Sequence, residues 1–537
     1  MSCLPWMAFV GLLALASADL FTAIADMERM LGHEKDVTSV IDQYISSEQE
    51  RLKELKKFAE EYVNRNNHAA NVGPEFVTNP INAFLLIKRL TSEWKKVEEI
   101  MKNNRADSFI QNITENRLRG QVKFPGEEDL SGAAIALLRL QDTYKLDSHE
   151  LSNGFMNGEK VGHALTAHDS FEIGRAAYNQ HDYYHVVMWM QVALNKLENE
   201  STKTIDESEV LEYLAFALYK QGNVRRALSL TKRLAEISPK HPRAKGNVKW
   251  YEDMLVGKDL EGELPPIVNK RDDNDGIDER DAYEALCRGE IEPIDPAEEK
   301  KLRCYLKRDK PFLKLAPIKV EILRLDPLAV LFKEVISDYE ISVVKELASP
   351  KLKRATVQNS VTGELETASY RISKSAWLKA VESPVIERIN QRIQYMTNLE
   401  QSTSEDLQVA NYGLGGHYDP HYDFARKEEK NAFKNLNTGN RIATVLFYMS
   451  QPEKGGATVF NHLNTAVFPS MHDALFWYNL KRNGDGDLRT RHAACPVLLG
   501  VKWVSNKWIH ERGQEFNRPC GLTEDIQEQF VGDLTPL

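Results

Sequence analysis

The stretch from Tyr412 to Phe424, YGLGGHYDPHYDF, holds the residues best suited to chemistry, because it contains two His-x-Asp pairs. The pairs are His417 with Asp419 and His421 with Asp423. Residues i and i+2 of a β-strand point to the same side, so each pair offers an imidazole and a carboxylate to one point. These are two of the three ligands of a facial triad for non-haem Fe(II). Polar strand edges carry the same motif by chance, and spacing leaves the two pairs interchangeable.

A complete triad needs a second histidine from a distant strand, and His492 in TRHAACPVL is the candidate. Lys502 follows ten residues later, inside the apolar run VKWVSNKW. Burying an ammonium group without a partner is costly. Lys502 therefore indicates either an edge strand that faces solvent or a pocket for an anionic partner, such as a dicarboxylate co-substrate.

Aromatic residues form a second candidate site, between residues 165 and 255. From Val210 the sequence predicts a helix, a turn at Gln221-Gly222-Asn223 and a second helix, the spacing of a tetratricopeptide repeat. Tyr213, Phe216 and Tyr219 are three residues apart and share one helix face. Such rings either fill the core of the helix pairs or line a concave groove for a Pro-rich peptide in the polyproline II conformation.

The elements that must position the His-x-Asp pairs begin near residue 319, where the pattern becomes β-rich. One helix is predicted around Val385 to Tyr395. Short apolar strands are predicted at Gln408–Tyr412, Arg441–Met449, Ala457–Phe460, Ala474–Tyr478, His492–Leu499 and Lys502–Ser505. Many short strands separated by Gly- and Pro-containing turns indicate a sandwich or jelly roll.

The region from residue 19 to about 150 is predominantly helical in pattern. Apolar residues recur at three- and four-residue steps between Val37 and Tyr62, which is typical of a coiled coil or of an ordinary bundle helix. A second apolar helix is predicted over Leu130 to Tyr144. Residues 256–318 carry Pro265-Pro266 and an acidic run, and we interpret them as a linker.

The chain has 537 residues and a formal charge of -10, which indicates about three domains and argues against a nucleic-acid partner. Its first 18 residues are apolar and end in Ala16-Ser17-Ala18, which predicts a secretory signal peptide cut after Ala18. No stretch reaches the roughly 20 apolar residues of a membrane span. Asn112 and Asn199 begin sequons and are predicted glycosylation sites.

Four cysteines follow the signal segment: Cys287, Cys304, Cys495 and Cys520. An even number of cysteines in an oxidising compartment predicts two disulfides, with three connectivities open. We favour the pairs that lie close in sequence, Cys287–Cys304 and Cys495–Cys520.

The order Pro-His-x-Asp, distal His and Lys resembles that of the Fe(II)/2-oxoglutarate dioxygenases of the prolyl 4-hydroxylase family. The strings GNRIATVLFYMS, GGATVF, FWYNL, RHAACPVL and KWVSNKWIHERGQEF are similar to the catalytic domain of collagen prolyl 4-hydroxylase alpha subunits. The resemblance continues through SGAAIALLRLQDTY, the repeat region and both cysteine pairs, so it covers essentially the whole mature chain.

The resemblance implies a multidomain α + β protein. Its parts would be a helical or coiled-coil dimerisation region (19–150), a TPR-like all-α peptide-binding domain (165–255), an acidic linker with a disulfide (256–318) and a catalytic domain (319–537). The catalytic domain would be a double-stranded β-helix, or jelly roll.

The resemblance also selects between the two His-x-Asp pairs, because the family's metal pair directly follows a proline, here Pro420. It implies that His421, Asp423 and His492 bind the metal, while His417 and Asp419 are flanking polar residues.

Further roles follow from the same resemblance. Lys502 would bind the distal carboxylate of 2-oxoglutarate, and Tyr412, Thr458 and His510 would line the co-substrate site. Tyr418 and Arg441 are weaker candidates for contacting the substrate proline.

By the same resemblance the groove residues would be Tyr178, Tyr213, Phe216, Tyr219, Arg243, Asn247 and Trp250. The family carries tyrosine where Phe216 and Trp250 stand, so two hydroxyl groups are missing from this groove.

The implied activity is hydroxylation of proline at C4 in collagen-like X-Pro-Gly sequences, with oxidative decarboxylation of 2-oxoglutarate. It requires Fe(II), 2-oxoglutarate, O2 and L-ascorbate. The implied partner is protein disulfide isomerase, the beta subunit of an α2β2 tetramer in the endoplasmic reticulum lumen. This partner would supply the retention signal, because the chain closes with DLTPL and has no KDEL-type sequence. The alternatives are a 2-oxoglutarate hydroxylase of another secreted protein and a non-catalytic chaperone for Pro-rich peptides.

Overall fold

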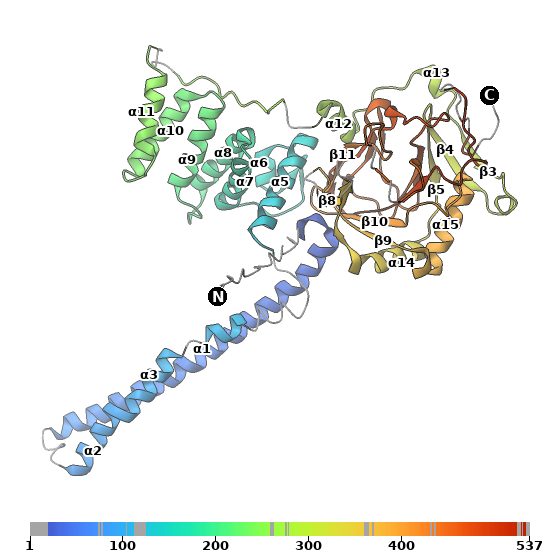
Figure 1. The fold of residues 1–537 in the computed structure, drawn as a ribbon. Helices are drawn as coiled ribbons and strands as arrows, with labels where there is room; N and C mark the ends of the chain where they lie inside the picture. Colours follow the sequence, from blue (N-terminus) through green and yellow to red (C-terminus); the bar gives the residue numbers. More distant parts are fainter. Residues whose placement is uncertain are drawn as a thin grey trace, which may run out of the picture. The chain divides into compact units, whose positions relative to one another are not determined.

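The computed structural model describes residues 20–532, except for 74–75, 77–78, 104, 112–124, 258–262, 274–276, 278, 359–364, 368–369, 430–431, 434–435, 524–527 and 529. The chain divides into two compact units, residues 26–125 and residues 1–25 with 126–537 (Figure 1). The predicted signal peptide and the Asn112 sequon lie outside the described residues. Asn199 is exposed at the end of a helix, and its glycosylation stays a prediction.

The unit of residues 26–125 is a helical hairpin. Its long helix is α1 (Ile24–Val72), and α2 (Pro80–Lys88) and α3 (Trp94–Lys102) return along it through a single π-helical turn. The Tyr62 hydroxyl donates to the Arg89 carbonyl at 3.1 Å, and the Arg51 guanidinium donates to the Ile100 carbonyl at 3.2 Å. The helical stripe predicted between Val37 and Tyr62 is therefore confirmed.

The hairpin leaves many large apolar side chains exposed. They include Leu31, Ile41, Leu52, Ile81, Phe84, Ile87 and Leu90. Large exposed apolar side chains in this number favour a surface that binds another protein.

The repeat region of the larger unit is all-α. Its helices are α5 (Glu127–Tyr144), α6 (Ser148–Ser152), α7 (Ala167–Asn179), α8 (Tyr183–Asn199), α9 (Glu207–Lys220), α10 (Val224–Ile237) and α11 (Ala244–Met254). The predicted turn at Gln221–Asn223 separates α9 from α10. Side chains of Thr166, Asp182 and Asp206 cap the starts of α7, α8 and α9, which fixes where these helices begin.

Helix α5 shares its core with these repeats, although the sequence analysis grouped it with the N-terminal helices. Its Leu138 and Leu140 lie in one buried cluster with residues of α7, α8 and α9. The indole of the fully buried Trp189 donates to Gln141 of α5 at 2.8 Å. Helix α5 therefore packs as part of the repeat region.

The region from residue 304 to residue 510 is built on two large antiparallel sheets, beside short two-stranded pairs. The larger has nine strands in the order β3-β4-β5-β16-β12-β19-β10-β9-β6, and the smaller has the order β11-β17-β14-β15. The strands of the larger sheet are β3 (Cys304–Lys307), β4 (Ile318–Leu325), β5 (Leu328–Lys333), β6 (Lys353–Arg354), β9 (Lys374–Leu378), β10 (Leu407–Tyr412), β12 (Arg441–Tyr448), β16 (Ala474–Tyr478) and β19 (Lys502–His510). Those of the smaller sheet are β11 (Tyr418–His421), β14 (Thr458–Phe460), β15 (Thr465–Val467) and β17 (His492–Ala494).

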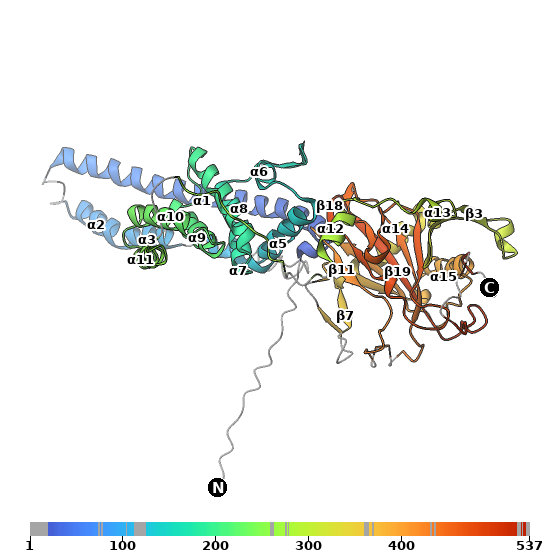
Figure 2. The same cartoon turned by 90° about the horizontal axis from the view of Figure 1, so that it is seen from above.

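Alternate residues of a strand in the larger sheet pack into different cores, one on each face of the sheet. On β12, Leu446 and Tyr448 belong to a core that includes Phe460 of the smaller sheet. Val445 and Phe447 belong to another core that includes residues of α14 (Asp338–Ala348) and α15 (Pro384–Thr397). The two helices cover the outer face of the sheet (Figure 1, Figure 2). The predicted jelly roll is confirmed.

Most predicted elements are found, with two differences. The predicted strand His492–Leu499 is broken into β17 and β18 (Val497–Leu499), because Pro496 lacks the N–H that a continuous ladder needs. Strand β18 pairs instead with β13 (Lys454–Gly455). The last predicted strand, Lys502–Ser505, continues to His510 as β19.

The favoured cysteine pairing is wrong. Cys287 forms a disulfide with Cys495, with Cα atoms 5.5 Å apart, while Cys304 and Cys520 are free, exposed thiols. The reason is the packing of α12 (Arg280–Cys287), whose Tyr283 and Leu286 lie in one cluster with Val459 and Ala493 of the smaller sheet. This contact brings Cys287 to the end of β17, which precedes Cys495.

None of the helices in the described part of the chain is long and apolar enough to cross a bilayer.

Candidate active site

The smaller sheet brings two predicted metal ligands face to face. Strands β11 and β17 pair with His421 opposite His492, and Asp423 lies two residues beyond the end of β11. The ligand atoms of these three side chains all lie within 4.8 Å of one another. Within the described residues this is the one cluster of three or more such side chains.

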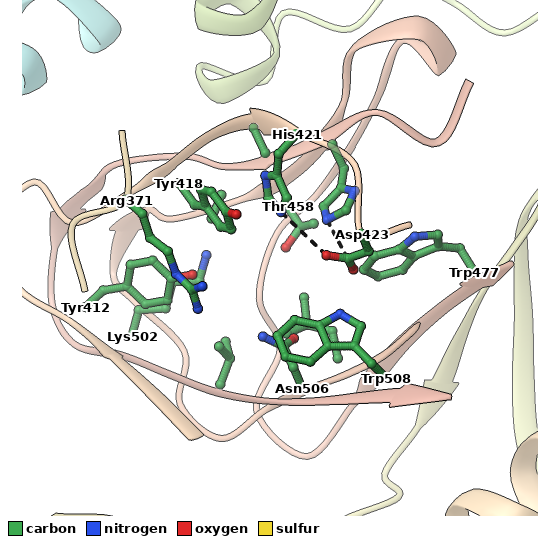
Figure 3. Close-up of a pocket in the computed structure, with 15 residues that line it drawn as sticks. Arg371, Tyr412, Tyr418, His421, Asp423, Thr458, Trp477, Lys502, Asn506 and Trp508 are labelled. Carbon is green, nitrogen blue, oxygen red and sulfur yellow. Dashed lines mark ion pairs between the residues drawn. The ribbon is translucent and has the colours of Figure 1, made fainter. Parts of the chain in front are cut away.

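The orientation of the three side chains suits a metal ion (Figure 3). The Nε2 atoms of His421 and His492 lie 3.7 and 3.6 Å from the two carboxylate oxygens of Asp423. The Nδ1 atoms of both rings face backbone carbonyls, at 2.8 and 3.0 Å. A histidine that donates its Nδ1 proton in this way presents the lone pair of Nε2 to a metal. The residues therefore fit the facial triad of non-haem Fe(II).

A chain of buried hydrogen bonds holds the Asp423 carboxylate. Thr444 of β12 donates to Asp423 at 2.8 Å and accepts from the Asn479 amide at 2.9 Å. The Asn479 carbonyl oxygen accepts from the Trp477 indole at 2.8 Å. The sequence analysis missed Thr444 and Asn479, although a polar residue inside the apolar run IATVLFY was a signal for the first.

Electrostatics favour a deprotonated site. Burial raises the pKa of the Asp423 carboxyl, but His492 and His421 outweigh burial and hold that pKa well below its usual value. Burial and the neighbouring His421 lower the pKa of His492 to about 4, against the attraction of Asp423. Metal binding requires a carboxylate and neutral imidazoles, so the pocket supplies Asp423 and His492 in the correct protonation states.

Lys502 reaches the same pocket from β19 of the larger sheet (Figure 3). Its side chain is buried, its Nζ atom has no hydrogen-bond partner in the described part of the chain, and the Tyr412 ring centroid lies 4.8 Å away. Burial lowers the pKa of this ammonium group to about 7. A buried amine without a partner is costly, and a carboxylate beside it would remove that cost. The prediction of an anionic partner is thus supported by geometry.

Three more predicted residues line this pocket: Tyr412, Tyr418 and Thr458. The Thr458 hydroxyl accepts from the hydroxyl of Tyr448 at 2.9 Å. The Tyr418 ring stacks on His421 with centroids 3.5 Å apart.

His510 and Arg441 do not line the pocket, although the Arg441 guanidinium donates to the Asp423 carbonyl at 3.3 Å. The ring nitrogens of His510 lie 2.8 Å from the Gly439 carbonyl and 3.0 Å from the Glu405 carboxylate. The Arg441 guanidinium forms hydrogen bonds of 2.6 and 3.0 Å with the same carboxylate and lies over the Trp508 ring. Both residues are at the end of the β12–β19 ladder, beyond Trp508, which is the last residue of β19 to line the pocket.

The pair His417–Asp419 lies outside the pocket. His417 is buried, its Nε2 is 3.3 Å from Asp419, and its backbone pairs with Ile372. An irregularity in the β11–β17 register falls between Tyr418 and His421. A bulge of this kind ends the simple two-residue alternation, so the two His-x-Asp pairs do not point to one site.

Arg371 is a pocket residue that the sequence did not single out. It is buried, and its guanidinium lies 4.8 Å from the Tyr418 ring centroid and donates to Gln408 at 2.9 Å. Trp477, Asn506 and Trp508 complete the polar and aromatic lining. The local pattern around Arg371, TASYRISK, contained no motif that predicted this position.

The predicted groove residues form a row of touching rings on α7, α9 and α11. Tyr178 contacts Tyr213 at 4.8 Å and Phe216 at 5.8 Å, and Tyr219 contacts Phe216 at 6.0 Å and Trp250 at 5.2 Å between ring centroids. All of these rings retain exposure, and Trp250 is 49% exposed. The rings therefore do not only fill the core, and their faces offer a binding surface.

The polar groove candidates lie near this row. Arg243 forms a 2.5 Å ion pair with Glu212, and Asn247 is half-buried on α11. Tyr183 also belongs to the row, through its contact with Phe216, and the sequence analysis did not include it.

Comparisons with known proteins agree with this architecture. Three family profiles match the chain: the prolyl 4-hydroxylase alpha-subunit N-terminal region (23–158), the prolyl 4-hydroxylase peptide-substrate-binding domain (167–257) and the 2OG-Fe(II) oxygenase superfamily (407–510). The matched profiles and the triad together define an Fe(II)- and 2-oxoglutarate-dependent oxygenase.

Individual relatives are similar over almost their whole length. Prolyl 4-hydroxylase subunit alpha-2 of Caenorhabditis elegans is 77% identical, covering 98% of this chain and 97% of that protein. Human prolyl 4-hydroxylase subunit alpha-1 is 49% identical, covering 95% and 97%. A solved viral collagen prolyl hydroxylase from Paramecium bursaria Chlorella virus-1 is 25% identical over 34% of this chain and 94% of its own, with a TM-score of 0.28. The chain belongs to the family of prolyl 4-hydroxylase alpha subunits.

Proposed function

We propose that this chain hydroxylates proline at C4 in X-Pro-Gly sequences of collagen-like polypeptides, with oxidative decarboxylation of 2-oxoglutarate to succinate and carbon dioxide. One observation carries the proposal. The triad of His421, Asp423 and His492 shares a pocket with Lys502, whose buried amine has no hydrogen-bond partner among the residues that the structure describes. A facial triad leaves metal positions open, and a buried amine complements the far carboxylate of a dicarboxylate.

The roles of the side chains follow from this geometry. Fe(II), held by the triad, would supply oxygen activation for the reaction. Thr444 and Asn479 fix the Asp423 carboxylate, and Lys502 binds and orients the distal carboxylate of 2-oxoglutarate. L-Ascorbate would return oxidised iron to Fe(II) after turnovers that do not hydroxylate the peptide.

The aromatic row of the repeat helices supports the choice of a Pro-rich substrate. Proline rings and the faces of Tyr178, Tyr213, Phe216, Tyr219 and Trp250 pack well, and a polyproline II chain loses little entropy on binding. Binding in this groove raises the effective concentration of prolines at the iron pocket.

The exposed apolar residues of the α1–α3 hairpin support assembly. We propose that this unit mediates alpha–alpha contact, and that protein disulfide isomerase completes an α2β2 tetramer in the endoplasmic reticulum lumen. The measurement that checks this is the mass of the complex after co-expression, before and after removal of residues 26–125.

The central experiment is peptide-dependent succinate release. The full chain, co-expressed with protein disulfide isomerase and supplied with Fe(II), ascorbate and 2-oxoglutarate, should release succinate only when (Pro-Pro-Gly)10 is present. Mass spectrometry should locate the new hydroxyl on the proline before glycine. Hydroxylation of lysine or of another secreted Pro-rich protein, without turnover of this peptide, would overturn the proposed substrate.

A further inference from the structure

The segment of residues 263–273, called the strap here, lies between the repeat helices and α12 (Figure 1). Side-chain amides hold its backbone. Asn223 donates to the Val268 carbonyl at 2.6 Å and accepts from the Val268 N–H at 2.8 Å. Gln221 makes the same reciprocal pair with Lys270, at 3.1 Å in both directions. The α9–α10 turn therefore fixes the backbone of the strap at two alternate residues.

A continuous set of charged groups begins where the strap ends. Arg271 lies 3.1 Å from one oxygen of Asp142 in α5 and 2.8 Å from Glu284 in α12. The other oxygen of Asp142 lies 3.1 Å from His185 of α8, which also contacts Asp182 at 2.5 Å. We call Asp182, His185, Asp142, Arg271 and Glu284 the Arg271 network.

The network is buried at two of its members and partly exposed at the other three. His185 and Glu284 are buried. Burial disfavours the charged form of His185, but hydrogen bonds to Asp142 and Asp182 outweigh it and raise the pKa to about 9. Removing one member of a partly buried charged set leaves the others uncompensated, which disturbs the geometry of the network.

Helix α12 is in turn anchored to the catalytic region. Cys287 at its end is bonded to Cys495, and its Tyr283 packs with Val459 and Ala493 of the smaller sheet. Arg288, directly after α12, donates to the Thr143 carbonyl of α5 at 2.9 Å. The strap and the Arg271 network thus connect the repeat helices to the same sheet that carries two metal ligands.

We propose that Arg271 and Glu284 are positioning residues, which fix the aromatic groove relative to the iron pocket and so determine the advantage of long peptides over short ones. The inference rests on the proposed function. When one protein holds two binding sites for the same peptide, binding at the first site raises the effective concentration of the peptide at the second. This concentration is highest when a stiff connection sets the sites at the distance that the peptide spans, and it is lower when the connection is loose. Arg271 and Glu284 stiffen this connection, to which the hydrogen bond from Arg288 to Thr143 also contributes.

The test uses the full chain in its complex with protein disulfide isomerase, with Arg271→Met, Glu284→Gln and their double variant. The readout is the ratio of kcat/KM for the long peptide (Pro-Pro-Gly)10 to that for the short peptide (Pro-Pro-Gly)2. We expect this ratio to fall about tenfold in each variant through a raised KM for the long peptide. The kcat, the KM for 2-oxoglutarate and the short-peptide kcat/KM should not change.

Two controls separate positioning from folding. Lys270→Ala removes an exposed side chain of the strap that contacts exposed Asp273, and it should leave the ratio unchanged. Affinity of the groove for polyproline, followed by tryptophan fluorescence, should be the same in all variants. The double variant should be no worse than Arg271→Met, because both substitutions break one connection.

An unchanged ratio in Glu284→Gln, the milder change, would overturn the inference even if Arg271→Met does not fold. A parallel loss of polyproline affinity would also overturn it, because the network would then only support the repeat fold. If the wild-type complex turns over neither peptide, the proposed function fails instead, and this outcome is distinct from the others.

Discussion

The iron pocket and the aromatic groove recognise their ligands in opposite ways. The pocket is built on paired strands, and its decisive groups are mostly buried polar side chains: the three proposed metal ligands and the Lys502 amine, which has no hydrogen-bond partner among the described residues. The groove is built on helix faces, and its rings are exposed in part and already contact one another.

The difference predicts how each region responds to mutation. Buried polar groups must have their partners in one arrangement. Removing one side chain therefore leaves another group unsatisfied, which costs about 1–3 kcal/mol of free energy. A row of rings offers interchangeable faces, and each one contributes only a share of the binding. The pocket should therefore lose activity sharply, and the groove should lose affinity gradually.

The largest loss of activity should come from a substitution in one His-x-Asp pair and not from the matching substitution in the other. His421→Ala removes a metal ligand and should lower succinate release at least about 1,000-fold, while His417→Ala should retain most of the activity of a folded protein. The measurement is peptide-dependent succinate release, with circular dichroism to confirm folding. The reverse result, an active His421→Ala and an inactive His417→Ala, would reassign the metal pair.

Lys502→Met should have the second largest effect. It keeps the apolar stem but removes the charge that a carboxylate needs, so the KM for 2-oxoglutarate should rise by about 10- to 100-fold, since a charged hydrogen bond contributes about 1.5–3 kcal/mol. The KM for the peptide should stay unchanged. Equal effects on both KM values would contradict the assigned role.

Lys502 should also make the binding of 2-oxoglutarate depend on pH. Burial lowers its pKa to about 7, so Lys502 is charged below this value and neutral above it. Binding of 2-oxoglutarate to the iron-loaded enzyme should therefore weaken as the pH rises from 7 to 9. Lys502→Met should lack this dependence, and titration of 2-oxoglutarate at each pH measures it.

Thr444→Val should have a smaller effect on the iron pocket, through the affinity for Fe(II). The substitution preserves shape but removes the hydrogen bond to Asp423 and leaves the Asn479 amide without that acceptor. Fe(II) affinity should fall about tenfold, which is typical for the loss of a group that orients a metal ligand. The concentration of Fe(II) at half-maximal activity measures this, and an unchanged value counts against the role of Thr444.

Tyr219→Ala should give the smallest effect. Removing one ring from the row should raise the KM for (Pro-Pro-Gly)10 about three- to tenfold and spare kcat, since one aromatic contact contributes about 0.5–1.5 kcal/mol. Tyr339→Ala, which removes an exposed ring on α14, is the matched control and should change nothing. A loss of kcat in Tyr219→Ala would mean that the groove acts on chemistry and not only on binding.

The sequence by itself determined the elements and the chemical type of the site. The turn between α9 and α10, the helix around Val385 and the strands that carry His492 and Lys502 follow from local periodicity and turn residues. The ligand types and the isolated lysine indicated a metal and an anion, because few other chemistries use those groups together.

Only the tertiary structure decided which of these residues meet. Cys287 pairs with Cys495 because α12 packs on the smaller sheet, and no sequence distance encodes that contact. An irregular register in β11 separates His421 from His417, and pairing with Glu405 keeps His510 away from the pocket. Such outcomes depend on side chains far apart in the chain, whose packing must be satisfied simultaneously, and local pattern carries no information about them.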